Sequence, residues 1–516
     1  MSDFSDRFDL ASLRLGAMVL ATSDDFFAEK ENLLLPHAAV WKEHEYTDRG
    51  KWMDGWESRR KRSDLSDNGC AGGHLHDWAI VRLGVPGVVR GVIVDTAFFR
   101  GNFPESCSLE ACAAPIDARL ETLLDPGTHW FELLPRSPLE GNSQNKFAVD
   151  VPWAATHVRL RIFPDGGVAR LRVYGDVAPD WGRIGHARGE LDLAAVEHGG
   201  DVLTCSDMFF GERRNLIMPW RAKNMSDGWE TRRRRGPGHD WALVRLGAVG
   251  SITRVELDTN HFRGNFPDTC KLEACHAPGA DIGYLTGADV HWQELLPRTK
   301  LQAHTRHYFE PELADVGLAS HVRLSVFPDG GVSRLRVYGE IDPAERKRLG
   351  VEQLDRLAPE DARRALEACC ASSKWVTAML AGRPFDSPEA VLAASDAAWA
   401  KTGPDDWKEA FLAHPRIGEK KATAPQSVMA RRWSAREQQG MSAATDEEKL
   451  AMVDANRAYE ERFGFRYIVC ATGKTAAEMV AFAQRRLTST VDEELRVAAA
   501  QQHEITRLRL EKLLDP

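Results

Sequence analysis

The stretch "HDWAIVRLG" at residues 76–84 returns almost unchanged as "HDWALVRLG" at residues 239–247. Other segments return in the same order along the chain: "DTAFFRGNFPESCSLEAC" (95–112) as "DTNHFRGNFPDTCKLEAC" (258–275), and "VRLRIFPDGGVARLRVYG" (158–175) as "VRLSVFPDGGVSRLRVYG" (322–339). Matching segments in a fixed order indicate a duplicated domain. We therefore expect a first repeat within residues 1–176 and a second repeat at residues 198–341.

Each repeat has the sequence pattern of a β-structure. Runs such as "WAIVRLG" (78–84) and "VVRGVIVDTAFF" (88–99) alternate apolar with polar residues, and clusters of Gly, Pro and Asp separate them. The segment "FPDGG" (163–167) predicts a turn, because Pro fixes φ and Gly accepts positive φ values. Many short strands at this spacing predict an all-β jelly roll, which is a β-sandwich, in each repeat.

The rest of the chain has a different character. We interpret "IDPAERKRLG" (341–350) as a charged linker. Helical periodicity follows in "SPEAVLAASDAAWAKTG" (387–403), which begins at a Ser-Pro cap, in "TAAEMVAFAQRRL" (475–487) and in "DEELRVAAAQQHEITRLRLEKLL" (492–514). The sequence therefore predicts a multidomain protein in which two tandem jelly-roll domains are followed by an all-α helical domain at residues 345–516.

Composition excludes several classes of protein. With 67 basic and 76 acidic residues the formal net charge is −9, so the chain as a whole does not attract a phosphate backbone and we expect no nucleic-acid partner. The nine cysteines form no CxxC pair, which argues against a zinc ribbon. The apolar run Ala17–Thr22 is too short for a signal peptide or a membrane span. We expect a cytoplasmic protein with no membrane partner, and the long helices and duplicated sandwiches favour a homo-oligomer.

One histidine of the helical region has unusual surroundings. In "DDWKEAFLAHPRIGEK" (405–420), Trp407, Phe411 and His414 follow each other at helical spacing, and Pro415 must end the helix. This spacing predicts an imidazole held at a helix end beside apolar side chains. A lone histidine in such a place is more often a capping or core residue, so this segment alone does not predict catalysis.

Two further motifs follow His414, "WSAREQQG" (433–440) and "NRAYEERFGFRYIVCATGKT" (456–475). With "HPRIG" they make the helical region resemble the OHCU decarboxylase family. The resemblance implies a cofactor-free decarboxylation of 2-oxo-4-hydroxy-4-carboxy-5-ureidoimidazoline (OHCU) to (S)-allantoin, with His414 as the catalytic residue. It also implies these substrate-binding residues: Pro415, Ser434, Glu437, Gln438, Ile468 with the backbone of residues 467–471, and Arg486. The chain departs from the family pattern after Arg486, where "LTST" lacks the asparagine that the pattern has three residues beyond the arginine.

The repeats carry a resemblance of their own. The motifs "DGWETRRRR" (227–235), "HDWALVRLG" (239–247), "LDTNHFRGNFPDTC" (257–270) and "FPDGGVSRLRVYG" (327–339) are similar to the allantoicase family. This resemblance implies hydrolysis of allantoate to ureidoglycolate and urea. Both resemblances belong to the degradation of urate, so we expect a bifunctional enzyme that acts on small ureides. The alternative is a decarboxylase joined to jelly rolls that serve as non-catalytic ligand-binding or scaffold modules.

Allantoate is a small anion with two ureido groups, so its site needs a guanidinium, acceptors for ureido N–H groups and an acid–base pair. The second repeat offers His239 and His261 as catalytic residues, and it offers as substrate-binding residues Glu230, Arg232, Asp240, Arg263 and Asn265, with Arg233 and Asn260 beside them. The counterparts in the first repeat are Glu57, Arg59, Arg60, His76, Asp77, Ala97, Phe98, Arg100 and Asn102. Because Phe98 replaces His261, either the second repeat holds the more complete site or the two repeats contribute unequally to one site.

The run of arginines in "ETRRRR" (230–235) is duplicated together with the fold, so we do not interpret it as a nuclear address. In an extended strand, Glu230, Arg232 and Arg234 would share one face. That face is a candidate clamp for the carboxylate of a small anion.

Two questions stay open at this point. "HLHDW" (74–78) contains a His-x-His pair, but "GPGHDW" (236–241) lacks the first histidine. We therefore assign no metal ligand, and a divalent metal remains one option for the hydrolase. Asp77 with Asp240, and Arg82 with Arg245, fit equally well as structural pairs that are repeated because the fold is repeated.

Overall fold

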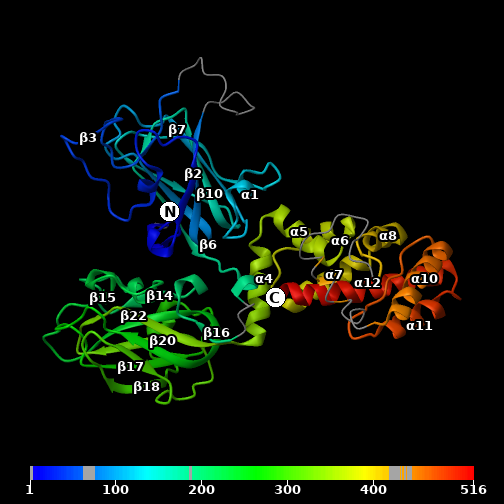
Figure 1. Ribbon diagram of the computed structural model, residues 1–516. Helices are drawn as coiled ribbons and strands as arrows, with labels where there is room; N and C mark the ends of the chain where they lie inside the picture. Colours follow the sequence, from blue (N-terminus) through cyan, green and yellow to red (C-terminus); the bar gives the residue numbers. More distant parts are fainter. Residues whose placement is uncertain are drawn as a thin grey trace. The chain divides into compact units, whose positions relative to one another are not determined.

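The computed structural model describes residues 4–61, 76–184, 189–417, 431, 433–434, 437 and 444–515. The chain forms two compact units, Met1–Arg346 and Lys347–Pro516. The first unit contains both repeats and is built mainly of strands, and the second is built of helices (Figure 1). The predicted order of two β-rich domains and one helical domain is therefore confirmed. In the described part of the chain, no helix is both long enough and apolar enough to cross a membrane.

A single long strand, β6 (Asp77–Asp95), organises the first repeat. Four strands flank it: β2 (Met18–Thr22), β9 (Gln144–Ala148), β10 (Ala154–Phe163) and β12 (Arg170–Val177). The N-terminal part of β6 pairs with β2 and β10, and its C-terminal part pairs with β9 and β12. The sheet order is β1-β12-β6-β10-β7-β8. Its edge strands are β1 (Phe8–Asp9) and β8 (Phe131–Pro138), and β7 (Ser106–Cys112) lies between β10 and β8.

The sequence predicts separate strands at residues 78–84 and 88–99, and this prediction is wrong because one strand runs through both segments. The glycines between them do not interrupt the strand. They let neighbouring backbone approach closely, since a Cβ atom at Gly87 would lie 2.6 Å from the carbonyl oxygen of Asp176. Because strand pairing continues on both sides of these glycines, β6 pairs with β2 and β10 in its N-terminal part and with β9 and β12 in its C-terminal part.

The second repeat has the same arrangement around β16 (Asp240–Asp258). The strands that flank β16 are β14 (Asp201–Cys205), β19 (Arg306–Phe309), β20 (Leu318–Phe327) and β22 (Arg334–Ile341). The sheet order is β13-β22-β16-β20-β17-β18, with β13 (Leu191–Asp192), β17 (Thr269–Cys275) and β18 (Gln293–Lys300). The minor elements of the two repeats are β3 (Tyr46–Thr47), β4 (Gly50–Lys51), β5 (Trp56–Glu57), β11 (Gly167–Val168), β15 (Trp229–Glu230), β21 (Gly331–Val332), α1 (Leu120–Leu124), α2 (Trp181–Ile184) and α3 (Ile282–Thr286).

The segment Asp-Gly-Trp-Glu fastens a loop to the sheet in each repeat. Trp56 and Trp229 are fully buried, and each indole N–H donates to a backbone carbonyl oxygen at 2.8 Å. Gly55 precedes Trp56 where the chain passes close to β11, since a Cβ atom there would lie 2.6 Å from the carbonyl oxygen of Val168. The glycine and the tryptophan of this motif therefore serve the fold.

The aspartate of the same motif binds a buried arginine. Arg170, which is 2% exposed, donates to the carboxylate of Asp54 at 2.8 Å. It also donates to backbone carbonyl oxygens, those of Asn32, His37 and Asp54. In the second repeat Arg334 binds Asp227 in the same way. The motif is thus held by an ion pair and by several carbonyl contacts at once.

The arginine run does not continue as a strand, because β15 ends at Glu230. Arg232 turns to Asp207, with 3.1 Å between Nε and Oδ1, and its side chain is 66% exposed. Arg234 turns to Asp240 instead. The predicted strand over this run is wrong, and the side chains of Arg232 and Arg234 diverge toward different carboxylates.

The predicted linker at residues 341–350 is also wrong, because α4 (Pro343–Asp355) occupies most of it. Asp342 caps this helix: its Oδ2 accepts the backbone N–H groups of Ala344 and Glu345 at 3.0 and 3.1 Å. Pro343 stands at the first helical position, which favours a helix start. The high charge of the segment is that of an exposed helix face.

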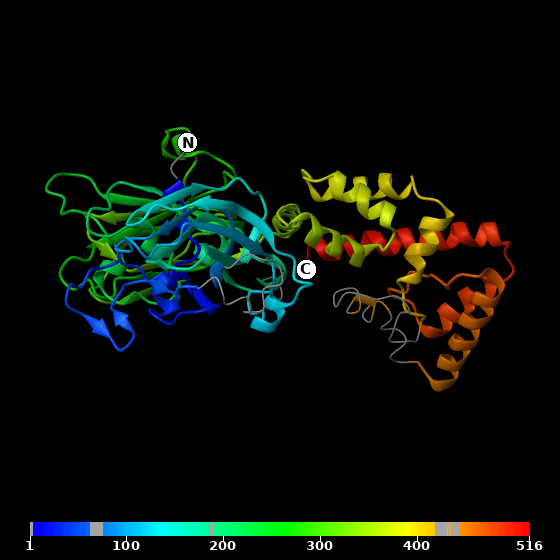
Figure 2. The ribbon, with the colours of Figure 1, turned by 90° about the horizontal axis from the view of Figure 1, so that it is seen from above.

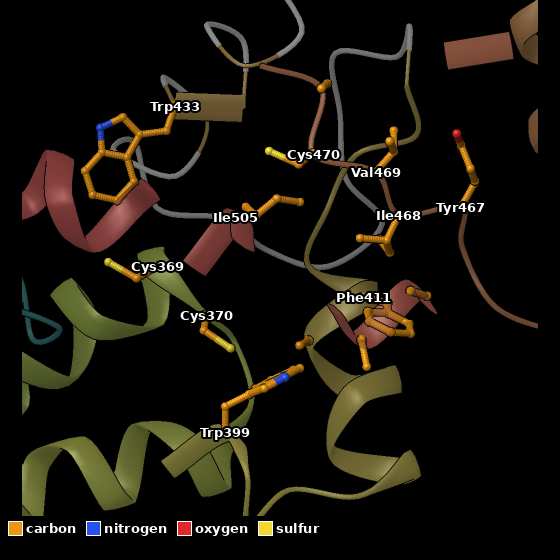
Figure 3. Packing of buried hydrophobic residues seen from close by; sticks show 14 of the residues in the cluster. Cys369, Cys370, Trp399, Phe411, Trp433, Tyr467, Ile468, Val469, Cys470 and Ile505 are labelled. Carbon is orange, nitrogen blue, oxygen red and sulfur yellow. The ribbon is translucent and has the colours of Figure 1, made fainter. Parts of the chain in front are cut away.

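The helical domain continues with α5 (Pro359–Cys369), α6 (Ser373–Ala381), α7 (Pro388–Trp399), α8 (Pro404–Leu412), α10 (Asp446–Phe463), α11 (Ala476–Arg486) and α12 (Val491–Leu514). The Ser-Pro cap predicted for α7 is confirmed, since Ser387 accepts the N–H of Ala390 at 3.1 Å. The long helix α12 packs against α5, α7 and α8 (Figure 2). Phe411, Ile468, Val469 and Ile505 belong to the buried core of this domain (Figure 3).

We predict that Arg170→Met lowers the free energy of unfolding of the β unit by about 3 kcal/mol, because it leaves the Asp54 carboxylate buried without its partner. Urea denaturation followed by tryptophan fluorescence measures the change. The matched control is Arg59→Met, whose side chain is 64% exposed beside Asp24; it should cost less than about 1 kcal/mol. Equal losses in the two variants would contradict the structural role of Arg170.

Candidate active sites

His414 lies directly after α8, where its backbone N–H donates to the carbonyl oxygen of Phe411 at 3.1 Å. α8 ends at Leu412, two residues before His414, so the predicted helix end next to Pro415 is confirmed. Residues later in the chain hold this backbone in place. Arg466 donates to the carbonyl oxygens of Leu412 and His414, and Asn456 donates to that of Ile417 at 3.0 Å. Glu460 accepts two hydrogen bonds of 2.8 Å from Arg416.

Glu437 and Arg509 form a buried ion pair beside His414. Arg509, from α12, donates to the two carboxylate oxygens at 3.1 and 2.8 Å and to the hydroxyl of Ser434 at 3.1 Å. Burial acts to raise the pKa of Glu437, but the hydrogen bonds and charge of Arg509 outweigh it and hold the pKa below its ordinary value. The carboxylate therefore stays ionised at neutral pH.

His414 lines a cavity whose walls are partly apolar and partly polar. The other lining residues are Pro415, Ile417, Ser434, Glu437, Tyr467, Ile468, Val469, Ala471, Thr472, Ile505 and Leu508. Burial lowers the pKa of His414 to about 3, and the charge of Arg509 acts in the same direction while Glu437 opposes it. The imidazole is therefore neutral at physiological pH and can accept a proton.

Gln502 is a buried polar residue near this imidazole. It is fully buried on α12, and its amide nitrogen donates to the hydroxyl of Thr506 at 3.2 Å. The side chain of Gln502 acts to raise the pKa of His414, against the larger lowering effect of burial.

The structure brings most of the predicted decarboxylase residues together. Pro415, Ser434, Glu437 and Ile468 line the same cavity as His414. Gln438 lies outside the described residues. Arg486 is not among the described residues that line the cavity.

Arg486 supports the cavity from behind. Its guanidinium donates to the carbonyl oxygen of Ile468 at 2.8 Å and to the buried carboxylate of Glu494 at 2.6 Å. Ile468 faces the cavity, so Arg486 acts on the wall that the substrate would meet.

Sequence reasoning misses Arg509, which is 4% exposed and holds Glu437. A signal for it exists. Gln502, Thr506 and Arg509 are polar residues at i, i+4 and i+7 on the buried face of α12. Polar side chains on one buried helix face require partners, so this pattern points to a site beneath the helix.

In the second repeat, His239, Asp240 and Arg234 form one group. Asp240 is 1% exposed and accepts hydrogen bonds from Arg234 and from the hydroxyl of Ser206, the latter at 3.0 Å. Burial lowers the pKa of His239, Arg234 and Arg323 act in the same direction, and Asp240 opposes them. The neutral imidazole of His239 is therefore favoured at neutral pH.

The turn at residues 327–331 joins this group to a second pair, Glu230 with Asn265. The carboxylate of Asp329 accepts the backbone N–H of Arg234 at 2.7 Å. At the C-terminal end of the turn, the backbone N–H of Gly331 donates to the carbonyl oxygen of Asn265 at 2.8 Å. At its N-terminal end, the ring of Phe327 lies 4.6 Å from that of His239. Five predicted or related residues thus border one loop: Glu230, Arg234, His239, Asp240 and Asn265.

The other predicted residues of this repeat have different neighbours. Nε2 of His261 lies 2.9 Å from the carbonyl oxygen of Ala222, and its backbone N–H donates to Nδ1 of His304. Arg232 turns to Asp207, as described above, and Arg263 is exposed. The structure therefore groups His239 with Asp240 and gives His261 separate surroundings.

The first repeat builds a counterpart of this group with lysine. Nζ of Lys61 lies 2.8 Å from Oδ1 of Asp77, and the hydroxyl of Ser23 donates to the same oxygen at 2.7 Å. Asn102 donates to Glu57 at 2.7 Å, as Asn265 does to Glu230. Both repeats thus contain a cation paired with an aspartate and an asparagine paired with a glutamate. Such pairs can serve the fold as well as a candidate site.

The described residues contain no group of three or more His, Cys, Asp and Glu side chains arranged to hold a metal ion. The first histidine of the His-x-His pair, His74, lies outside the described part of the chain. The structure therefore adds no metal ligand to the sequence prediction.

Two protein families match the chain. The allantoicase repeat matches residues 8–178 and 191–342, and OHCU decarboxylase matches residues 355–511. A protein named probable allantoicase from Photobacterium profundum is 47% identical over 337 residues, which cover 65% of this chain and 97% of that protein. One of the same name from Stutzerimonas stutzeri is 46% identical over 342 residues, covering 66% of this chain and 97% of its own length.

A solved allantoicase structure agrees with the match of the β repeats. The crystal structure of allantoicase from Saccharomyces cerevisiae is 34% identical, covers 65% of this chain and 93% of that chain, and has a TM-score of 0.51. A crystal structure of OHCU decarboxylase in the presence of (S)-allantoin is 27% identical and covers 30% of this chain and 99% of that chain, with a TM-score of 0.26. Since the allantoicase match extends over more than half of its residues, the chain belongs to the allantoicase family, and it carries an OHCU decarboxylase domain at residues 355–511.

Proposed function

We propose that the chain is a bifunctional enzyme of urate degradation. The β unit hydrolyses allantoate to ureidoglycolate and urea, and the helical domain decarboxylates OHCU to (S)-allantoin. The observation that carries the second activity is a neutral His414 beside the ionised Glu437–Arg509 pair in one cavity. The first activity is supported by the neutral His239 beside the buried Asp240–Arg234 pair.

In the decarboxylation, a hydroxyl group sits on the carbon that loses CO2. The neutral imidazole of His414 removes or relays the hydroxyl proton while the bond to CO2 breaks. Apolar walls such as Ile468 disfavour the compact charge of the substrate carboxylate more than the diffuse charge of the transition state. Ser434 and Glu437 bind N–H groups of the ring and the ureido arm, and Arg509 fixes Glu437 for that purpose.

Further contacts complete the decarboxylase site in this proposal. Pro415 closes the cavity next to His414, and Gln438 and the backbone of residues 467–471 bind polar groups of the substrate ring. Arg486 positions Ile468 through its carbonyl oxygen. The reaction needs no cofactor, because protonation and charge placement by side chains are sufficient for it.

In the hydrolysis, the bond between the central carbon of allantoate and one ureido nitrogen is replaced by a bond to water. His239 takes a proton from the water and returns it to the nitrogen that leaves with urea. Glu230 and Asn265 bind ureido N–H and C=O groups, and Asp240 keeps Arg234 in place beside His239. Arg232, Arg263 and His261 are left for charge steering or structure.

We also propose the finer features of the molecule. Each repeat is a jelly roll, which the sharing of β6 and β16 between two groups of strands supports. The domains are residues 1–176, 198–341 and 345–516. The protein acts in the cytoplasm as a homo-oligomer, and its partners are small ureides. Urea release from allantoate with and without added Mn2+ or Zn2+ tests whether the hydrolase requires a metal.

We predict that His414→Asn lowers kcat for OHCU decarboxylation by about 100-fold, because asparagine cannot accept the proton. Circular dichroism of the (S)-allantoin formed from fresh OHCU, corrected for the uncatalysed reaction, measures the rate. Urea release from allantoate by the same sample is the control and should not change. Unaltered turnover of OHCU would remove His414 from the mechanism.

The low pKa of His414 predicts a specific pH dependence. The active form is the neutral imidazole. When the pH is lowered through 6.5, the ordinary histidine value, kcat/KM for OHCU should therefore stay constant, and it should decline only as the pH approaches the pKa of about 3. The measurement is a pH profile of decarboxylation over the range in which the chain stays folded by circular dichroism. A decline centred near 6.5 would show instead that His414 titrates as an exposed histidine does.

For the β unit, we predict that His239→Asn lowers urea release from allantoate by about 100-fold. His261→Phe should keep most of the activity, because the first repeat carries Phe98 at the same position with the same backbone, φ 69° against 71°. Colorimetric urea determination measures both, with OHCU decarboxylation as the control. The reverse order of effects would move catalysis to His261. No urea from the unmodified chain, with and without added Mn2+ or Zn2+, would favour non-catalytic binding modules.

A further inference from the structure

A groove of about 410 Å³ lies beside His239 on one face of the second-repeat sheet. It is lined by His239, which directly precedes β16, and by side chains from three neighbouring strands: Trp241, Lys271, Glu273, Arg323 and Ser325. They form two rows across the sheet. Trp241 pairs with Ser325, which pairs with Lys271, and in the next row Leu243 pairs with Arg323, which pairs with Glu273.

The first repeat has the same rows with two exchanges. Trp78 pairs there with Arg161, and Arg161 pairs with Ser108. The place of Ser325 on the central strand is thus taken by Arg161, and the place of Lys271 on the neighbouring strand is taken by Ser108. Each repeat therefore has one cationic residue in this row, Arg161 on the central strand of the first repeat and Lys271 on the neighbouring strand of the second.

The exchange moves the long cationic side chain from the central strand in the first repeat to the neighbouring strand in the second. In the first repeat, Arg161 reaches along the face to the next row, where its guanidinium lies 2.9 Å from Glu110, and Arg159 binds the same carboxylate. The long side chain of Arg161 therefore covers the surface between the rows. In the second repeat, Lys271 on the neighbouring strand makes this reach, with its Nζ 3.2 Å from Glu273, and the short Ser325, which is 2% exposed, lies at the bottom of the groove.

The charges of the groove suit a small carboxylate with ureido groups. Nε and Nη2 of Arg323 both bind one oxygen of Glu273, at 3.0 and 2.8 Å, and Nζ of Lys271 lies 3.2 Å from the other oxygen. Nζ of Lys271 also lies 3.3 Å from the half-exposed carboxylate of Glu294, so this lysine can turn from one partner to another. The guanidinium of Arg323 also lies over the ring of Trp292, 4.7 Å from its centre, which fixes its plane.

We propose that this groove is the allantoate-binding pocket. Lys271 and Arg323 bind the substrate carboxylate, and His239 stands at the groove to act on the central carbon. Glu273 and Ser325 bind one ureido group, and the other is left to Glu230 and Asn265. Arg161 closes the equivalent face of the first repeat, so each chain has one hydrolytic site. The proposal rests on the proposed hydrolysis of allantoate and assigns that activity to the second repeat.

The test transfers each exchange from the first repeat to the second in the full-length chain. Ser325→Arg should lower kcat/KM for allantoate by about 100-fold, because it fills the groove. Lys271→Ser should raise KM by about tenfold, because the carboxylate loses one charged partner. Arg161→Ser is the matched control in the first repeat and should leave urea release unchanged. Ser325→Ala should keep the groove open and retain activity.

Isothermal titration with allantoate and thermal unfolding of each variant separate the outcomes. If Ser325→Arg is folded and loses both binding and urea release, the groove is the substrate pocket. If the Ser325→Arg and Lys271→Ser variants keep the kcat/KM and KM of the unmodified chain for allantoate, the groove is not the substrate pocket. The proposed hydrolase activity would not be affected by that result. An unmodified chain that binds allantoate, releases no urea and loses binding on Ser325→Arg would support the pocket and refute the hydrolysis.

Discussion

Each β repeat depends on the buried arginine that begins the sequence "RLRVYG". In the second repeat, Arg334 is 3% exposed and binds both the carboxylate and the carbonyl oxygen of Asp227. A charge at this depth is tolerated only because its donors find acceptors, and removing either partner would leave the other unpaired. The bond fixes the Asp-Gly-Trp-Glu segment, so Trp229 enters the core and Glu230 reaches Asn265 beside the turn at 327–331. The place of the candidate site is thus a consequence of how the fold is held.

The helical domain uses the same principle. Arg466 and Asn456 donate to backbone carbonyl oxygens on either side of His414, and Arg486 donates to that of Ile468. Side chains that bind main-chain oxygens fix a loop more strictly than apolar packing does, because hydrogen bonds have a direction. The motifs of this domain therefore supply two kinds of residue, those that line the cavity and those, such as Arg466, that hold the backbone carrying them. Arg486 illustrates the distinction: it belongs to the motif set but acts through the wall.

The sequence predicts what depends on periodicity and local chemistry. The duplicated β domains, the helix that ends before His414 and the cap at Ser387 follow from spacing and from proline. Contacts between distant residues are not predicted in this way. Nothing local shows that β6 continues through Gly84 and Gly87, since close backbone approach and chain reversal both select glycine. The direction of Arg232 and Arg234 is likewise set by Asp207 and Asp240, which stand elsewhere in the chain. Arg509 is missed because a polar residue in a charged helix looks exposed until packing buries it.

Duplication changes how the repeats are best compared. A residue that both copies keep is explained by the fold as readily as by catalysis, and Trp56 with Trp229, or Arg170 with Arg334, are of this kind. Function that only one copy performs must instead appear as a difference between them. Once one copy carries the reaction, the other is constrained only to fold, and an arginine such as Arg161 can lie across its sheet face, paired with Glu110. The exchange of Arg161 for Ser325 therefore says more about where a substrate enters than the motifs by which the repeats are recognised.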